Sequence, residues 1–166
     1  TDSNNIDYEV HNSFNDGLCR QLNTSTKEVR INKNATYLNW RYIDNPFANY
    51  KIISLANISG VIVYKVIQSF SDKEKTEIDI MEIAFDNNIE NLQLLLNAVI
   101  HYETNEINQF NIWDSIFSSE YLQLKKIGFI SQMPLTYLGF LNLASEDKSP
   151  EHYEKWNINF GYSDVF

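Results

Sequence analysis

The apolar pattern between positions 76 and 129 constrains the fold of this chain more than any other feature. Residues 76–85 alternate as in a β-strand, whereas residues 89–102 carry leucine and valine at helical spacing. Residues 105–113 then predict a second strand. A strand, a helix and a strand of these lengths most naturally form a right-handed parallel crossover. The sequence therefore predicts one parallel strand pair with a helix between its members.

The first of these strands changes its side-chain phase in the middle. Ile78 and Ile80 belong to one phase, whereas Ile83 belongs to the other. Because side chains on a strand alternate with a period of two, the change requires either an extra residue or burial on both faces. The first possibility is a β-bulge near Met81 and Glu82, and the second is a central strand with two covered faces. Both stay open at the level of sequence.

Further elements flank this unit. Strands are predicted at 50–56, 61–67 and 135–143, and further helices at 12–22, 34–44 and 120–127. The first two of these strands form a hairpin whose turn, 57–60, ends in Gly60, a residue available for positive φ. Gly128 is expected to end the last helix. The polar residues 1–9 are expected to be a loose lead-in.

These elements predict the mixed α/β (α+β) class. We expect a single domain over residues 1–166, with a mostly antiparallel central sheet, one parallel crossover and helices on both faces. Residues 1–33 are expected to be a helical lead-in, 34–143 the core and 144–166 a C-terminal tail. Since the chain begins with Thr and a polar stretch, we also expect it to be a piece of a longer protein.

Charge and composition narrow the partners. The net charge of −9 and the pI near 4.7 disfavour a nucleic acid or an anionic membrane surface as partner. No run reaches the roughly 18 apolar residues of a membrane span, and no signal-peptide pattern opens the chain. Cys19 stands alone and the histidines lack ligand spacing, so we expect no metal site. A cytoplasmic location is the expectation.

The element order, together with the run Leu124-Lys125-Lys126-Ile127-Gly128-Phe129 at the end of a short helix, resembles the GNAT superfamily of acyl-CoA-dependent N-acyltransferases. The resemblance covers about residues 35–143. The segment 37–46 and the tail 156–164 are similar to GNAT-type proteins from bacterial polysaccharide loci. The resemblance implies transfer of an acyl group, such as acetyl, from acyl-CoA to an amine on a small-molecule or sugar acceptor, for example an amino sugar or a cell-surface precursor.

The resemblance also implies where acyl-CoA binds. The bulged strand is expected to splay from its parallel neighbour, so that the backbone around Ile83 and Ala84 binds the acyl-pantetheine arm. The next loop and helix start would then hold the pyrophosphate through Asn87, Asn88 and Asn91. This loop departs from the glycine-rich pattern of the family, because it holds no glycine, no arginine and two acidic residues. Asparagine can adopt left-handed conformations, so an amide nest is one reading and a capped helix start is the other.

The resemblance implies two catalytic residues. Glu82 is the candidate general base, because a partly buried carboxylate can have its pKa raised toward neutrality. The alternative for Glu82 is an outward-facing acid at a strand edge. Tyr121 is the candidate acid that protonates the leaving thiolate, although the family position falls on Leu124. The alternative for Tyr121 is to pack the short helix on the sheet.

Three residues are candidates for binding the acceptor. Arg41 could bind an anionic group bidentately, or it could pair with Asp44 or stack on an aromatic ring. Asp114 and Ser115 follow the second strand of the crossover, near the same cleft, or they merely end that strand.

Two other functions remain in competition. One is a non-catalytic GNAT-like domain that binds substrate or a partner domain, while a second domain of the same full-length protein holds acyl-CoA. The other is an aminoacyl transferase of the double-domain kind that builds peptidoglycan cross-bridges. Binding of charged tRNA is disfavoured for the latter by the net charge of −9.

Overall fold

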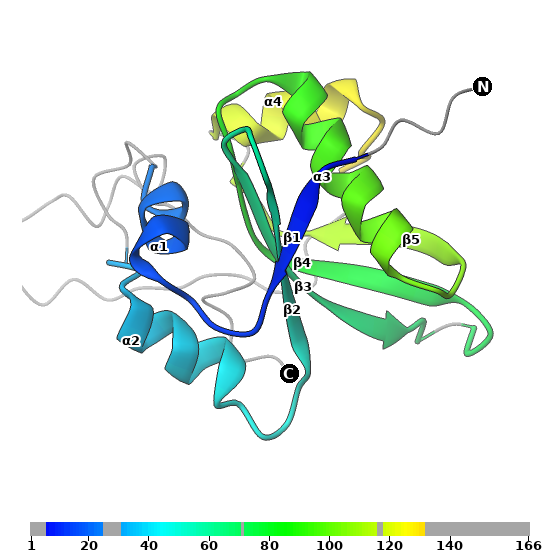
Figure 1. Cartoon of the computed structure of the whole chain (residues 1–166). Coiled ribbons are helices and arrows are strands. Elements are labelled where there is room, and N and C mark those ends of the chain that lie inside the picture. The colour runs from blue at the N-terminus through cyan, green and yellow to red at the C-terminus, as the bar shows by residue number, and fades with distance from the viewer. Residues whose placement is uncertain (1–5, 25–30, 71, 116–117, 132–166) are drawn as a thin grey trace, which may run out of the picture.

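The structure is a computed structural model, which describes residues 6–24, 31–70, 72–115 and 118–131 (Figure 1). Its centre is a five-stranded sheet in the order β1-β2-β3-β4-β5. The strands are β1 (Tyr8–His11), β2 (Tyr50–Leu55), β3 (Gly60–Gln68), β4 (Thr76–Phe85) and β5 (Ile107–Ile112). The first three pairings are antiparallel, and β4 pairs with β5 in parallel. The predicted mixed sheet with one parallel crossover is confirmed.

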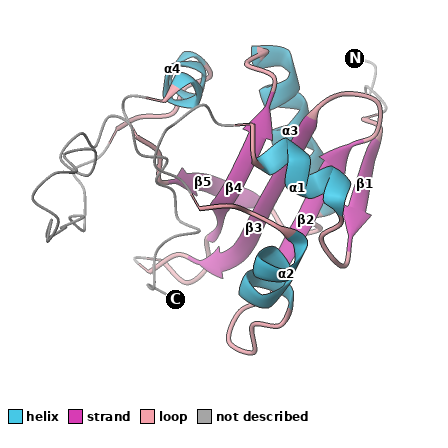
Figure 2. Ribbon diagram, turned by 90° about the vertical axis from the view of Figure 1, so that its left-hand side faces the viewer, coloured by secondary structure: helices cyan, strands magenta, loops and turns pink. Residues whose placement is uncertain are grey.

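Helices cover both faces of this sheet (Figure 2). They are α1 (Asp16–Leu22), α2 (Ala35–Leu38), the π-helix η1 (Asn39–Ile43), α3 (Ile89–Tyr102) and α4 (Ser119–Lys126). Residues of α3 and α4 form one core cluster with the sheet, and α1, α2 and η1 contribute to the other. We call these the α3 face and the α1 face. Because both are buried, β4 carries apolar residues in both side-chain phases.

The crossover helix α3 has the bounds that its leucine spacing predicts. Leu92, Leu95 and Val99 are fully buried against the sheet, and each such burial contributes about 1.5–3 kcal/mol. The side chain of Asn88 accepts a hydrogen bond from the Glu90 amide and caps the helix start. Helix α4 is capped by Ser118 and ends at Lys126. Gly128 follows the C-cap residue Ile127 with a φ of 107°, as predicted for a C-terminal glycine.

The second predicted helix, 34–44, forms with a change in its hydrogen bonding. It begins as α2, capped by Asn34, and continues as the π-helix η1. The Asp44 amide donates to the carbonyl of Asn39 at 2.9 Å, which marks the wide π turn. Arg41 and Tyr42, adjacent in this turn, are both buried on the α1 face. Such turns occur often at functional sites.

Two local expectations are wrong. Residues 8 and 9 are not part of a loose lead-in, because Tyr8–His11 forms the edge strand β1. An edge strand pairs with one neighbour and buries few side chains, so its sequence carries only a weak apolar pattern. Gly60 does not have positive φ. It is needed for close approach, since a Cβ there would lie 2.9 Å from Leu55 Cδ1.

The strand predicted at 135–143 and the tail 144–166 lie outside the described residues. Within the described part, no helix has the length and apolar content required to cross a bilayer.

Candidate functional site

Strand β4 contains a bulge at Met81. In the register with β3, Glu82 faces Val63 and Ile80 faces Tyr64, which leaves Met81 as the extra residue. Ile80 points to the α3 face, whereas Met81 packs in the α1-face core and Glu82 bonds residues of that face. The two readings of the phase change are therefore both correct, because the strand is bulged and is also buried on both sides.

The pairing of β4 with β5 ends directly beside this bulge. The last paired positions of β4 and β5 are Ile80 and Ile112. Beyond them β5 ends, while β4 continues from Met81 to Phe85. Among the strands that the structure describes, this stretch pairs with β3 alone. The expected splaying of the two parallel strands stays a prediction, because the pairing shows only that β5 ends here while β4 continues.

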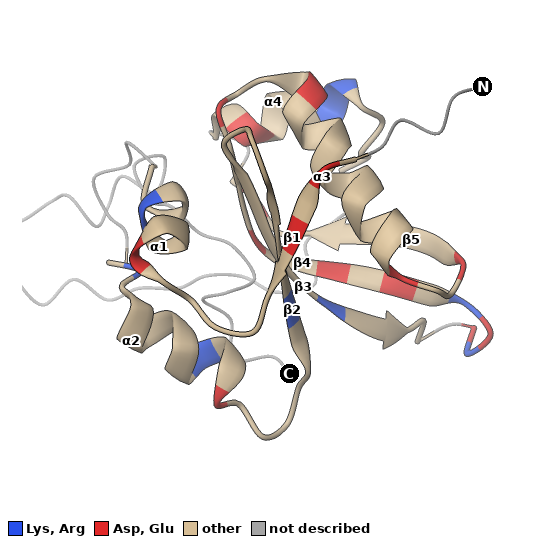
Figure 3. Cartoon of the chain, in the orientation of Figure 1, with Lys and Arg blue, Asp and Glu red and all other residues tan. Residues whose placement is uncertain are grey.

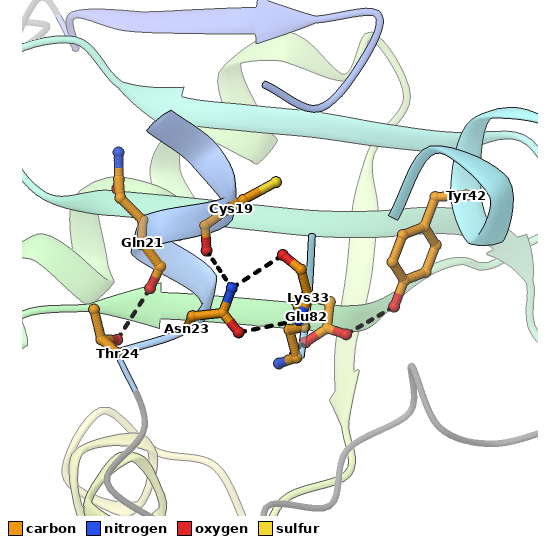
Figure 4. A network of polar contacts seen from close by, with 7 residues as sticks. All are labelled: Cys19, Gln21, Asn23, Thr24, Lys33, Tyr42 and Glu82. Atoms are coloured by element: carbon orange, nitrogen blue, oxygen red, sulfur yellow. Dashed lines mark hydrogen bonds and ion pairs between the residues drawn. The ribbon is translucent and has the colours of Figure 1, made fainter. Parts of the chain in front are cut away.

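Glu82 lies at the centre of a buried polar cluster (Figure 4). Its Oε2 accepts a hydrogen bond from Lys33 Nζ at 2.7 Å, and its Oε1 accepts one from the Tyr42 hydroxyl at 2.9 Å. Lys33 is 4% exposed and Glu82 is 1% exposed. The alternative of an outward-facing acid at a strand edge does not hold. Lys33 is a site residue that the sequence analysis missed, since nothing near it in the sequence marks it as the partner of β4.

Asn23 fixes the backbone of Lys33 within this cluster. The Asn23 side chain donates to the carbonyl oxygens of Lys33 at 3.0 Å and of Cys19 at 2.8 Å. It also accepts from the Lys33 amide at 3.1 Å. The end of α1 is therefore joined to the segment that carries Lys33 to the β4 bulge. We call Asn23, Lys33, Tyr42 and Glu82 the closed cluster.

The closed cluster affects the acidity of its tyrosine. Burial raises the pKa of Tyr42 well above its ordinary value, and the Glu82 carboxylate raises it further. The Tyr42 hydroxyl consequently keeps its proton and acts as a donor to Glu82. Through its hydrogen bonds with Lys33 and Tyr42, the Glu82 carboxylate holds the bulge to the α1 face.

The loop before α3 has the form of a capped helix start. Asn91 donates its side-chain amide to Asp86 Oδ1 at 2.7 Å, and the Glu90 amide donates to Asn88 Oδ1 at 2.9 Å. Asn87 has a φ of 57°, the left-handed conformation that the sequence analysis considered for this residue. Thus the asparagine-rich loop turns into α3 through one asparagine in the left-handed conformation.

The other predicted residues lie around the end of β5 and on α4. Asp114 directly follows β5 and accepts hydrogen bonds from the Ser115 amide and the Ser118 hydroxyl, so it shapes the turn into α4. The exposed Tyr121 hydroxyl lies 2.8 Å from Ser131 Oγ. Leu124 is buried among α3-face residues. The catalytic candidates Glu82 and Tyr121 therefore lie on opposite sides of the sheet layer.

Next to the closed cluster lies a set of polar residues that the sequence analysis did not single out. Tyr50, Lys65, Asp79 and Asn111 face one another in register across the strands β2, β3, β4 and β5. All four point to the α1 face, because their chain neighbours pack on the α3 face. We call these four residues the polar row. Lys65 and Asp79 were visible as alternating polar positions, but the sequence alone does not give the register between strands.

The polar row has few internal contacts. Lys65 Nζ lies 3.7 Å from Asp79 Oδ2. Asn111 Nδ2 donates to Asp79 Oδ1 at 3.1 Å and to Glu77 Oε2 at 2.9 Å. Figure 3 shows the acidic positions along the first half of β4. Among the described residues no group of three or more His, Cys, Asp or Glu side chains is arranged to hold a metal ion.

Comparisons with protein-family models, with curated proteins and with solved structures find no match to this chain. The functional proposal therefore rests on the geometry of the site.

Proposed function

We propose that this chain is a GNAT-type acyltransferase domain, which transfers an acyl group such as acetyl from acyl-CoA to an amine of a small-molecule or sugar acceptor. The observation that carries the proposal is that the pairing of β4 with β5 ends beside the Met81 bulge. Beyond Ile80, the edge of β4 that faces away from β3 has no described strand beside it. Such an edge suits an extended ligand that carries amide groups, because backbone N–H and C=O groups seek hydrogen bonds.

The start of α3 supports the same proposal. This 14-residue helix follows the stretch of β4 around Ile83 and Ala84, and its positive end favours an anion by about 0.3–1 kcal/mol. The left-handed Asn87 turns the chain into the helix. Asp86 and Glu90 are acidic residues in the same field. We therefore expect acyl-CoA to bind through its pantetheine arm more than through its phosphates.

The geometry gives the two catalytic candidates different roles in this function. Glu82 already binds Lys33 and Tyr42 in the core, so it fits a residue that positions the bulge. The exposed Tyr121 hydroxyl can give up its hydrogen bond with Ser131 and donate to the departing thiolate instead. The ammonium form of the acceptor first loses a proton to solvent. In the transfer step the neutral amine nitrogen attacks the thioester carbon, the C–S bond breaks, and the thiolate takes the phenolic proton. The proton released by the amine passes to solvent, which then reprotonates Tyr121.

Calorimetric titration with acetyl-CoA tests the proposal, and Asn87 provides a matched pair of variants. Asn87→Gly keeps the left-handed conformation and should retain binding. Asn87→Val places a β-branched residue there at a cost of roughly 1–2 kcal/mol, so we expect about 5- to 30-fold weaker binding. Absence of saturable binding by the wild-type chain at millimolar acetyl-CoA would contradict the proposal.

A second function, a non-catalytic GNAT-like domain that binds substrate or a partner domain, is favoured by one observation. The closed cluster and the capped start of α3 use polar groups that an active enzyme would offer to its ligands. Binding of an amine acceptor together with no binding of acetyl-CoA would support this alternative.

A further inference from the structure

The Tyr50 hydroxyl is a buried polar group with no hydrogen-bond partner among the described residues. The Tyr50 side chain is 7% exposed and packs edge-on against Tyr42, with ring centroids 5.0 Å apart. A buried hydroxyl without a partner costs roughly 1–3 kcal/mol, so native proteins rarely retain one without a reason. A group beyond the described residues is therefore needed to complete this hydrogen bond.

Two charged side chains, Arg41 and Asp79, act on Tyr50. Burial raises the pKa of Tyr50, Arg41 lowers it, and Asp79 raises it. The hydroxyl is thus close enough to Arg41 and to the polar row for both charges to act on it. Its register partner on β3 is Lys65, which faces Asp79 in turn. Tyr50 and Asp79 consequently lie on the same face of the sheet, two strands apart, with Lys65 between them.

The carboxylates of this surface keep capacity for a further donor. An ionised carboxylate offers about four acceptor positions. Asp79 uses one for Asn111 and lies 3.7 Å from Lys65, which is longer than a hydrogen bond. The same Asn111 amide reaches Glu77 at 2.9 Å. The pair of carboxylates that Asn111 joins therefore offers acceptors, while Tyr50 offers a hydroxyl that can donate or accept.

We propose that the polar row, together with Glu77, binds a hydroxylated primary amine, whose ammonium group contacts the Asp79 and Glu77 carboxylates and whose hydroxyl group bonds the Tyr50 hydroxyl. Its role as the acceptor of the acyl group rests on the proposed function. The position suits that role, because Asp79 and Asn111 are the last pair before Ile80 and Ile112, where β4 and β5 part. An amine held there lies next to the edge proposed for the thioester.

Glucosamine is the probe, because it carries an ammonium group beside hydroxyl groups. Glucose lacks the ammonium, and N-acetylglucosamine has it acylated. We expect saturable binding of glucosamine in a titration followed by calorimetry or amide chemical shifts, and at least about tenfold weaker binding of the two analogues. Glucose binding as tightly as glucosamine would overturn the proposal.

Three variants locate the binding. Asp79→Asn removes the charge with little change of shape, so we expect about tenfold weaker glucosamine binding. Tyr50→Phe removes one hydroxyl and should weaken binding about fivefold, with an unchanged or higher Tm. Tyr8→Phe is the matched control, because Tyr8 bonds His101 at 3.0 Å and packs on the α3 face. Its affinity should equal that of the wild type.

The outcomes separate this inference from the proposed function. If glucosamine binds in the expected way while acetyl-CoA does not bind, the inference stands and the acyltransferase proposal fails. If acetyl-CoA binds while glucosamine does not, the inference fails. Equal affinity in Asp79→Asn, Tyr50→Phe and the wild type would also overturn it, since the probe would then lie elsewhere on the protein.

Discussion

Two neighbouring polar regions on the α1 face, the closed cluster and the polar row, each contain a lysine and a carboxylate, but the distance and the exposure of the pair differ. In the closed cluster, Lys33 and Glu82 meet at 2.7 Å, and their side chains are 5% and 1% exposed. In the polar row, Lys65 and Asp79 lie 3.7 Å apart and are 15% and 13% exposed. Each region contains one carboxylate of β4. Asp79 precedes the last residue of β4 that pairs with β5, and Glu82 follows it.

Their tyrosines make the contrast sharper. Tyr42 and Tyr50 are in ring contact, yet the Tyr42 hydroxyl donates to Glu82 and the Tyr50 hydroxyl has no partner among the described residues. A buried polar group that is paired within the protein supports the fold. One that is left unpaired is costly and calls for an explanation. The closed cluster is therefore structural support, whereas the polar row is the surface that we propose binds the amine.

The largest expected effect is on the closed cluster. Lys33→Met leaves the Glu82 carboxylate buried without its cationic partner, which should lower the free energy of unfolding by about 3–5 kcal/mol. Urea denaturation followed by circular dichroism measures the change. Lys75→Met is the control, because the ion pair of Lys75 with Asp72 is largely exposed. A loss for Lys33→Met no greater than for the control would show that the cluster does not support the fold.

The next largest effect concerns the Tyr42 hydroxyl, which is hydrogen-bonded to Glu82. Tyr42→Phe removes a donor to a buried carboxylate, so we expect a loss of about 1.5–3 kcal/mol in unfolding free energy. The same urea denaturation measures it. A stability equal to that of the wild type would mean that Tyr42 and Tyr50 do not differ, and the comparison would lose its basis.

Alkaline pH should lower the free energy of unfolding through Tyr42. Its pKa is raised in the folded chain by burial and by Glu82, while the unfolded value is about 10. Above pH of about 10 the unfolded state loses the proton that the native state keeps, so stability falls as pH rises, by about 1.4 kcal/mol per unit. Below that pH the contribution is fully present. Tyr42→Phe should reduce the slope of unfolding free energy against pH, and an identical slope would contradict the assignment.

The smallest effect is expected for the unpaired hydroxyl. Tyr50→Phe removes a polar atom without breaking a hydrogen bond, so unfolding free energy should stay unchanged or rise by up to about 1 kcal/mol. Thermal unfolding of the two Phe variants side by side gives the difference directly. A loss similar to that of Tyr42→Phe would reveal a partner for Tyr50 within the protein itself.

The parts of the fold that depend on local patterns could be predicted from the sequence. Helix α3 follows from its leucine spacing, and Asn34 marks the start of the helix predicted at 34–44 because its short side chain accepts a backbone hydrogen bond. The bulge at Met81 was one of two readings of a phase change. The edge strand β1 was missed, because a short edge strand buries little apolar surface.

The site was less accessible to sequence reasoning. Glu82 was singled out, but its partner Lys33 lies far away in the chain and enters through the Asn23 contact. The polar row depends on cross-strand register, which turns and bulges set in three dimensions. Tyr50 carries no local signal at all, since an unpaired hydroxyl is a property of the packed core. Long-range pairing is thus the reason why the open part of the site became visible only in the structure.

The most direct test of the central claim is an amide NMR titration of the wild-type chain with acetyl-CoA. The account predicts that the backbone amides of β4 beyond the bulge, including Ile83 and Ala84, and those of Asn87 and Asn88 shift together and saturate. The chemical shift of the backbone amide of Tyr8, the control residue on the α3 face, should not change. If millimolar acetyl-CoA moves none of the β4 and loop amides, or moves only residues elsewhere, the parting of β4 and β5 does not hold acyl-CoA.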